Sequence, residues 1–214
     1  MKVLFTGFDP FGGATINPAY EAVKLLPDTI AGAEIIKVEI PTVFRKGAET
    51  MLAAVEEHKP DVVICVGQAG GRATMNPEFV AINYQDARIA DNEGNQPLGE
   101  TIKEDGANAY FTKLPVKAMV QNMRDAGIPA TISYTAGTYV CNDVMYYLMY
   151  NIEKKWSDIV GGFIHVPYAA SQVVNMPATT PSLSLQMISD GLRIAAETVI
   201  ASKDDIAVAG GETH

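Results

Sequence analysis

The stretch DVVICVG at residues 61–67 decides the fold that the sequence predicts. It is a short, continuous apolar run, which is typical of a central strand buried on both faces. The segment before it carries an apolar stripe at helical spacing, formed by Ala48, Met51, Leu52 and Val55. A helix followed by a buried strand is therefore the local unit from which the rest of the fold is inferred.

The same alternation of strand-length apolar runs and helix-period segments continues nearly from end to end of the chain. Strands are predicted at residues 2–6, 33–40, 130–134 and 161–166. Helices are predicted from Asn17 as N-cap and Pro18 as first helical residue, from Pro115, and over residues 139–155 and 183–200. This pattern predicts an α/β fold in which a largely parallel sheet lies between two layers of helices.

The length of 214 residues, 48% of them hydrophobic, is sufficient for one large core. We expect a single domain over residues 1–214, with a disordered tail from about residue 209. One long stretch, from Gln85 to Leu114, lacks periodicity and is rich in turn residues. A loop of that length is usually functional or carries a small hairpin of its own.

Composition restricts the partners and the compartment. The net charge of -9 and the pI of about 4.8 argue against nucleic acid or an anionic membrane, because both require clustered Lys and Arg. The first apolar run covers only residues 3–5, too short for a signal peptide, and no segment approaches the roughly 18 apolar residues of a spanning helix. Cys65 and Cys141 are therefore expected to be reduced thiols in a cytoplasmic protein.

The two cysteines occupy different sequence environments. Cys65 lies in the middle of the apolar run 61–67, where a small packing residue is expected. Cys141 follows the turn-like "AGT" at the start of a helical pattern. With Thr138 as N-cap, Cys141 would be about the third helical residue, where unpaired N–H groups and the helix dipole favour a thiolate. The rest of that helix is so apolar that a packing role for Cys141 fits equally well.

A thiol nucleophile needs a histidine and an orienting group. His58 stands at the end of a charged helix and His214 at the end of the chain, whereas His165 lies near the end of a predicted strand, where α/β folds place their sites. A satisfied core histidine explains His165 as well as a catalytic one does. Glu78, at the edge of an apolar run, is a candidate acid, and a surface glutamate is the alternative. The sequence has no paired-cysteine or HExxH zinc motif and no phosphate-binding glycine loop.

A series of blocks gives these candidates a context. The chain contains, in order, "LFTGFDPFGG", "NPAYEAV", "IPTVF", "PDVVICVGQAGGR", "PEFVAIN", "DARIADNEGNQP", "SYTAGTYVCN", "GGFIHVPY" and "PSLSL". In these blocks it resembles the pyroglutamyl peptidase I (pyrrolidone-carboxylate peptidase) family of cysteine peptidases over nearly its whole length. The resemblance implies a catalytic triad of Cys141 as nucleophile, His165 as general acid and base, and Glu78 as the acid that orients the imidazole.

The resemblance also implies the remaining features of such an enzyme. These are a three-layer α/β/α sandwich with a twisted mixed sheet, no cofactor, peptide substrates with an N-terminal pyroglutamate, and a homotetramer. The residues implied in substrate binding are Phe8 and Phe11 as aromatic walls, Asn17 and Gln68 as polar contacts, and Arg88 near the oxyanion.

Two positions depart from the family pattern. Asn76 replaces a Ser or Thr, and Phe79 replaces a basic residue directly after Glu78. These changes leave one rival class, a catalytically silent α/β binding protein that kept the pocket. A second rival is a nucleoside-phosphorylase-like enzyme, which shares the sandwich class but requires a phosphate-dependent reaction.

Overall fold

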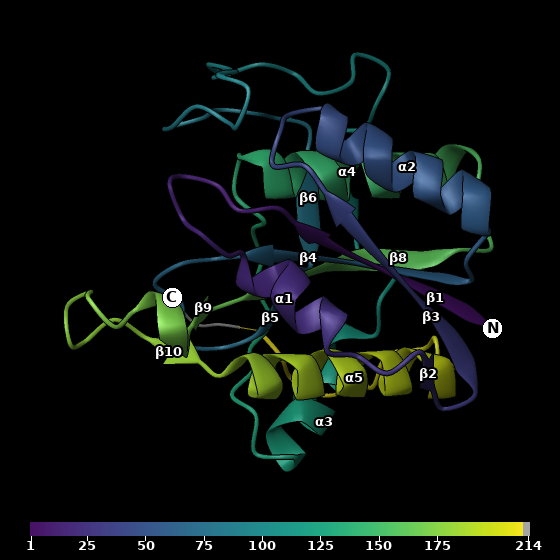
Figure 1. Cartoon of the computed structure of the whole chain (residues 1–214). Coiled ribbons are helices and arrows are strands. Elements are labelled where there is room, and N and C mark those ends of the chain that lie inside the picture. Colours follow the sequence, from purple (N-terminus) through teal and green to yellow (C-terminus); the bar gives the residue numbers. More distant parts are fainter. Residues whose placement is uncertain (212–214) are drawn as a thin grey trace.

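The computed structural model describes residues 1–211 and has a six-stranded sheet at its centre (Figure 1). The order across the sheet is β2 (Thr29–Ile30), β3 (Ala33–Ile40), β1 (Lys2–Phe8), β4 (Val62–Gln68), β8 (Val160–Val166) and β5 (Asn76–Pro77). The four long strands are mutually parallel, and the short edge strands β2 and β5 are antiparallel to their neighbours. The predicted largely parallel, mixed sheet is thus confirmed.

Helices cover both faces of this sheet. Helices α1 (Pro18–Lys24), α3 (Val116–Asp125) and α5 (Leu185–Ala201) pack on one face, and α2 (Lys46–His58) and α4 (Val140–Lys154) pack on the other (Figure 1). Side chains of β4 alternate between the two cores, with Val62, Ile64 and Val66 on the α1/α5 side and Val63 and Cys65 on the α2/α4 side. Because β4 is buried on both faces, its sequence is an uninterrupted apolar run.

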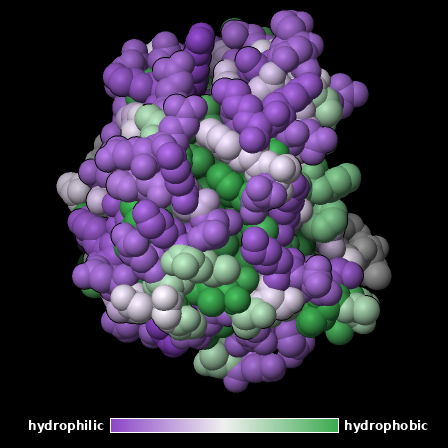
Figure 2. All heavy atoms as spheres, turned by 90° about the vertical axis from the view of Figure 1, so that its right-hand side faces the viewer, coloured by the Kyte–Doolittle hydropathy of each residue, from purple (hydrophilic) through white to green (hydrophobic). Residues whose placement is uncertain are grey.

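Short elements complete the chain. The strands β6 (Val80–Ile82) and β7 (Ala109–Phe111) pair antiparallel, and β9 (Tyr168–Ala169) pairs parallel with β10 (Ser182–Leu183). A 3-10 turn, η1 (Ala170–Gln172), follows β9. The long polar stretch 85–114 therefore contributes one strand of a small two-stranded sheet. The face at the amino ends of the parallel strands is covered mainly by hydrophilic residues, with apolar side chains visible between them (Figure 2).

The prediction of a strand at residues 130–134 is wrong. This segment lies beside β5 and forms only isolated bridges, Met75 with Ala130 and Glu78 with Ser133. Single hydrogen bonds join the two segments on either side of Pro77, including Thr131 N–H to Met75 O at 3.0 Å and Phe79 N–H to Ser133 O at 2.7 Å. Proline has no N–H to donate, so the ladder is interrupted at Pro77.

The tail expected from about residue 209 lies partly outside the described residues, which end at residue 211. Within the described part, the Tyr134 hydroxyl donates to Gly210 O at 2.8 Å. No helix within residues 1–211 combines the length and the apolar character that crossing a membrane requires.

Candidate active site

The carboxyl edge of the parallel strands brings His165 and Glu78 together. His165 is near the end of β8, and Glu78 directly follows β5, which pairs antiparallel with β8. The Glu78 N–H donates to Phe163 O at 2.9 Å, so the backbone holds the glutamate against the histidine strand. Open α/β sheets generally place their sites at this edge.

His165 and Glu78 form a buried, hydrogen-bonded pair. The distance from His165 Nδ1 to Glu78 Oε1 is 2.6 Å, and the two residues are 4% and 0% exposed. Since a carboxylate only accepts, Nδ1 carries the proton and donates it, which leaves Nε2 for proton transfer. The Phe163 ring lies 4.8 Å from the imidazole centroid and limits its rotation. This geometry excludes a surface role for Glu78.

Cys141 lies in the first turn of α4, but the predicted cap is wrong. The helix begins at Val140 with Tyr139 as N-cap, so Cys141 is its second residue and no side chain caps the helix. The Thr138 hydroxyl instead donates to Asp86 O at 2.8 Å, which fixes the segment before the helix. Without a side-chain cap, the N–H groups of the first turn stay available for an anionic group near Cys141.

Gly67 makes room for the Cys141 sulfur. A Cβ atom built on Gly67 would lie 2.9 Å from Cys141 Sγ and 2.7 Å from the Phe163 ring. Gly67 is also the residue of β4 that pairs with His165 of β8. The sulfur is thus packed against the strand pair that carries the histidine, in a space that only a glycine leaves open.

The electrostatics at Cys141 oppose the expectation of a lowered pKa. Burial and, after it, the charge of Glu78 raise the pKa of the Cys141 thiol to about 12, although the charge of Arg72 and a backbone N–H lower it. The residue keeps partial exposure, but protein atoms surround its sulfur closely. The helix N-terminus therefore does not outweigh burial, and deprotonation requires a nearby base. Burial likewise raises the pKa of Cys65 to about 12, and that residue is fully buried as predicted.

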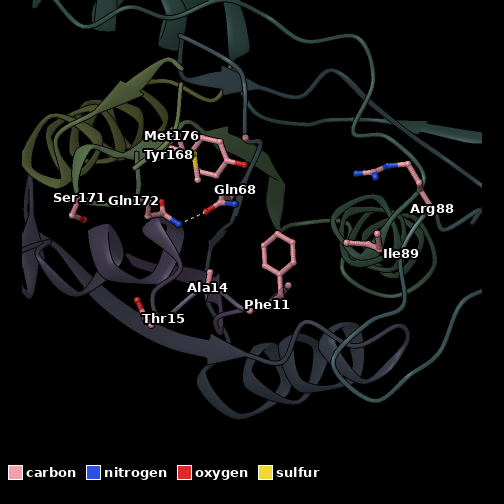
Figure 3. A pocket seen from close by; sticks show the side chains of 13 residues that line it. Phe11, Ala14, Thr15, Gln68, Arg88, Ile89, Tyr168, Ser171, Gln172 and Met176 are labelled. Carbon is pink, nitrogen blue, oxygen red and sulfur yellow. Dashed lines mark hydrogen bonds between the residues drawn. The ribbon is translucent and has the colours of Figure 1, made fainter. Parts of the chain in front are cut away.

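A cavity of about 660 Å³ lies between loops at the same edge of the sheet (Figure 3). Phe11, Gln68 and Arg88 all line it, together with Ile89, Tyr168 and Met176. The Gln68 amide oxygen accepts from Gln172 Nε2 at 2.9 Å, and Gln68 directly follows Gly67, which contacts Cys141. The cavity thus begins one residue along β4 from the glycine beside the Cys141 sulfur, although Cys141 and His165 are not among its lining residues, and it has an aromatic wall and an amide held by Gln172.

The other two residues expected at the substrate lie beneath this surface. Phe8 is only 2% exposed, and its ring is 6.3 Å from that of Phe163. Asn17 is also 2% exposed; its side-chain oxygen accepts from Ala19 N–H as the predicted N-cap, and its amide donates to Asp9 O. Asn17 thereby holds one end of the loop at residues 9–16, part of which lines the cavity, and Phe8 directly precedes that loop.

Arg72 is a site residue that the sequence reasoning missed. Its Nη1 donates to Glu78 Oε1 at 2.9 Å, the same oxygen that His165 contacts. The "GQAGGR" block that contains it matches no phosphate-binding glycine motif. A usable signal was present, since a buried Glu78 requires a cation and Arg72 is the nearest one along the chain.

Within the described residues, the side chains at the two departures from the family pattern contact groups other than Glu78, although Asn76 is the pairing partner of His165 across β5 and β8. The Asn76 amide donates to Thr131 Oγ1 at 2.7 Å, and the half-buried Phe79 ring packs against Phe111 and Tyr134 at 5.2 and 5.6 Å. Within residues 1–211, no group of three or more His, Cys, Asp or Glu residues could hold a metal ion.

The chain is similar to known proteins at the level of family, sequence and structure. The family model described as "Pyroglutamyl peptidase" matches residues 1–202. The pyrrolidone-carboxylate peptidases of Clostridium perfringens and Enterococcus faecalis are each 58% identical to this chain, over 99% and 100% of both sequences. The crystal structure of pyroglutamyl peptidase I from Bacillus amyloliquefaciens has a TM-score of 0.94 at 51% identity and covers 97% of this chain and 99% of that one. A mutant pyrrolidone carboxyl peptidase from Pyrococcus furiosus has a TM-score of 0.90 at 40% identity and covers 94% and 99%.

Proposed function

Because the chain belongs to the pyroglutamyl peptidase family, we propose that Cys141, His165 and Glu78 catalyse the hydrolysis that this family performs. The enzyme is a cysteine peptidase that removes an N-terminal pyroglutamyl residue from peptides. The family membership decides against a nucleoside-phosphorylase-like enzyme. The observation that carries the residue assignment is the buried 2.6 Å contact between His165 and Glu78, beside the glycine that accommodates the Cys141 sulfur.

In the first half of the reaction, Cys141 gives its proton to His165 Nε2, and the sulfur attacks the pyroglutamyl carbonyl carbon. The N–H groups of the first turn of α4, assisted by Arg88, stabilise the negative charge that develops on the carbonyl oxygen. His165 then donates the proton to the departing nitrogen, and the peptide leaves with a free amine. A thioester between Cys141 and the pyroglutamyl group remains.

In the second half, His165 takes a proton from water, and the resulting hydroxide attacks the thioester carbonyl. The sulfur leaves, receives the proton from His165, and free pyroglutamate is released. Glu78 accepts the Nδ1 hydrogen bond throughout, which keeps Nε2 directed at the reacting atoms and stabilises the imidazolium. The raised pKa of the Cys141 thiol makes this proton transfer to His165 necessary at neutral pH.

The cavity fits an uncharged ring better than an ammonium group. Phe11 offers a flat wall, Gln68 offers hydrogen-bonding groups for the lactam, and Arg88 is the charged residue of the lining. Bringing the ammonium of an ordinary N-terminus next to Arg88 would cost desolvation and repulsion. We assign Phe8 and Asn17 a supporting role below the loop. A neutral substrate residue is thereby selected over free N-terminal glutamine or glutamate.

A homotetrameric state and a cytoplasmic location remain part of the proposal. A peptidase that works through a free thiol requires a compartment in which the thiol stays reduced, and both cysteines are unpaired in this structure. Light scattering coupled to size-exclusion chromatography would measure the assembly, and a monomer at assay concentration would contradict the tetramer.

The residue assignment is tested with Cys141→Ala, assayed on a pyroglutamyl chromogenic amide. We expect turnover to be lost while the folded structure, checked by circular dichroism, is retained. Cys65→Ala is the matched control, because it removes the other thiol from the buried core and should keep the chemistry at some cost in stability. Wild-type protein without turnover would instead support the silent binding protein.

A further inference from the structure

The carboxylate of Glu78 has two neighbours on one oxygen. Oε1 accepts from His165 Nδ1 at 2.6 Å and from Arg72 Nη1 at 2.9 Å. The other oxygen, Oε2, is buried and has no hydrogen-bond partner in the part of the chain that the structure describes. The whole residue is 0% exposed. Glu78 therefore has few groups with which to offset the cost of burying its charge.

From this geometry we propose that Arg72 is a positioning residue for the reaction, whose positive charge offsets the buried charge of Glu78 and holds the carboxylate on His165. Within residues 1–211, the cationic side chains in contact with Glu78 are Arg72 and, when protonated, His165. During the steps in which His165 is neutral, Arg72 alone supplies the opposite charge. Without an opposite charge, the buried carboxylate would carry a high desolvation cost and would be held less firmly on the imidazole.

The second arm of the guanidinium reaches the segment that leads to the nucleophile. Arg72 Nη2 donates to Thr135 O at 3.4 Å, a long hydrogen bond. Thr135 precedes Gly137, which has a φ of +79° and turns the chain toward α4 and Cys141. The planar fork of an arginine can contact both groups at once, which the single ammonium of a lysine cannot do in the same way. Arg72 thus links the acid of the triad to the turn before the nucleophile.

The charge of Arg72 acts on the sulfur as well. The negative charge of Glu78 raises the pKa of the Cys141 thiol, and the positive charge of Arg72 lowers it. Arg72 therefore offsets part of the penalty that the orienting acid imposes on the nucleophile. The residue directly after Glu78 is Phe79, which packs against aromatic rings and supplies no charge.

The inference rests on the proposed triad and is tested by the pH dependence of kcat/KM on a pyroglutamyl chromogenic amide. Removing a positive charge raises the pKa of every neighbouring group, so Arg72→Gln should move the acid limb upward by about one pH unit. The pH profile of iodoacetamide alkylation at Cys141 should move in the same direction. KM should change less than twofold, because Arg72 is not among the residues that line the cavity.

Arg72→Lys separates charge from shape. It keeps the positive charge and loses the fork. The acid limb of the pH profile should therefore stay at the wild-type pH, while kcat falls because the contact with Thr135 O is lost. Arg124→Gln is the matched control, since Arg124 Nε donates to Ala130 O at 2.7 Å in the same segment as Thr135 but contacts no triad residue. If Arg72→Gln fails to fold, Arg72→Met provides an uncharged side chain with a flexible apolar stem.

Two results would overturn the inference. The first is an acid limb of the kcat/KM profile that stays at the wild-type pH in Arg72→Gln. The second is an acid limb that moves equally in Arg72→Gln and Arg72→Lys. Glu78→Gln distinguishes this failure from a failure of the triad. If Glu78→Gln lowers kcat but Arg72→Gln leaves the profile in place, only the role of Arg72 is refuted. If Glu78→Gln keeps the wild-type kcat, the assignment of the orienting acid fails.

Discussion

Substitution of Gly67 by alanine should impair chemistry without changing any reacting group. The added Cβ would lie 2.9 Å from Cys141 Sγ, and ordinary contact begins at 3.4 Å, so the sulfur must move by about 0.5 Å. The new atom would also lie 2.7 Å from the Phe163 ring, which packs against His165 and has little freedom to retreat. Since a displacement of about 1 Å costs on the order of 10²-fold in rate, we expect kcat to fall about tenfold.

The assay measures kcat and KM on a pyroglutamyl chromogenic amide, together with the thermal unfolding midpoint. Gly161→Ala is the control, because its Cβ would lie 2.7 Å from Ile152 Cδ1 and 3.2 Å from Leu148 Cδ2, at flexible side-chain ends of α4 away from the sulfur. It should lower stability and leave kcat nearly unchanged. The reasoning is refuted if Gly67→Ala keeps the wild-type kcat, or if Gly161→Ala loses as much.

Two further substitutions test the cavity and the start of α4. Phe11→Ala removes an apolar wall of the cavity and should raise KM by about tenfold with a smaller effect on kcat. Phe111→Ala, which removes an exposed ring outside the cavity, is the control. An equal rise of KM in the two variants would contradict the assignment of Phe11. Burial raises the pKa of Asp143 to about 6, so the folded protein favours the protonated carboxyl. The stability contributed by this protonated form is fully present below the ordinary pKa of an aspartate and is lost as the pH rises through 6. Asp143→Asn should therefore gain up to about 2–3 kcal/mol of unfolding free energy relative to wild type between pH 4 and 7, measured by urea denaturation; a constant difference across that range would argue against a buried, neutralised Asp143.

The sequence predicted the buried strands well because their signal is local. The limits of β3 agree with residues 33–40, and the N-cap and first residue of α1 are as expected. These elements are specified by continuous apolar runs, an asparagine and a proline within a few residues of one another. The segment 130–134 was different, because its pairing depends on Pro77, far away in the sequence. A missing donor on a partner strand leaves no mark in the segment itself.

The candidate site shows the same division. The positions of Cys141 at a helix start and of His165 at a strand end follow from local pattern, and their pairing with Glu78 followed from the family resemblance. Three features of the site follow only from the three-dimensional structure: the absence of a Thr138 cap, the dense packing that raises the pKa of Cys141, and the contact between Arg72 and Glu78. Each depends on how segments distant along the chain pack around a buried group.

The central claim is that Cys141 forms the covalent intermediate, with His165 and Glu78 serving the proton transfers. It is tested most directly by acid quenching during turnover of a pyroglutamyl ester, followed by proteolysis and mass spectrometry. We predict a pyroglutamyl thioester on the peptide that contains Cys141, accumulating further in His165→Ala if acylation by the activated ester persists. A pyroglutamyl group found on Cys65, or a turnover burst in Cys141→Ala equal to that of the wild type, would contradict the account.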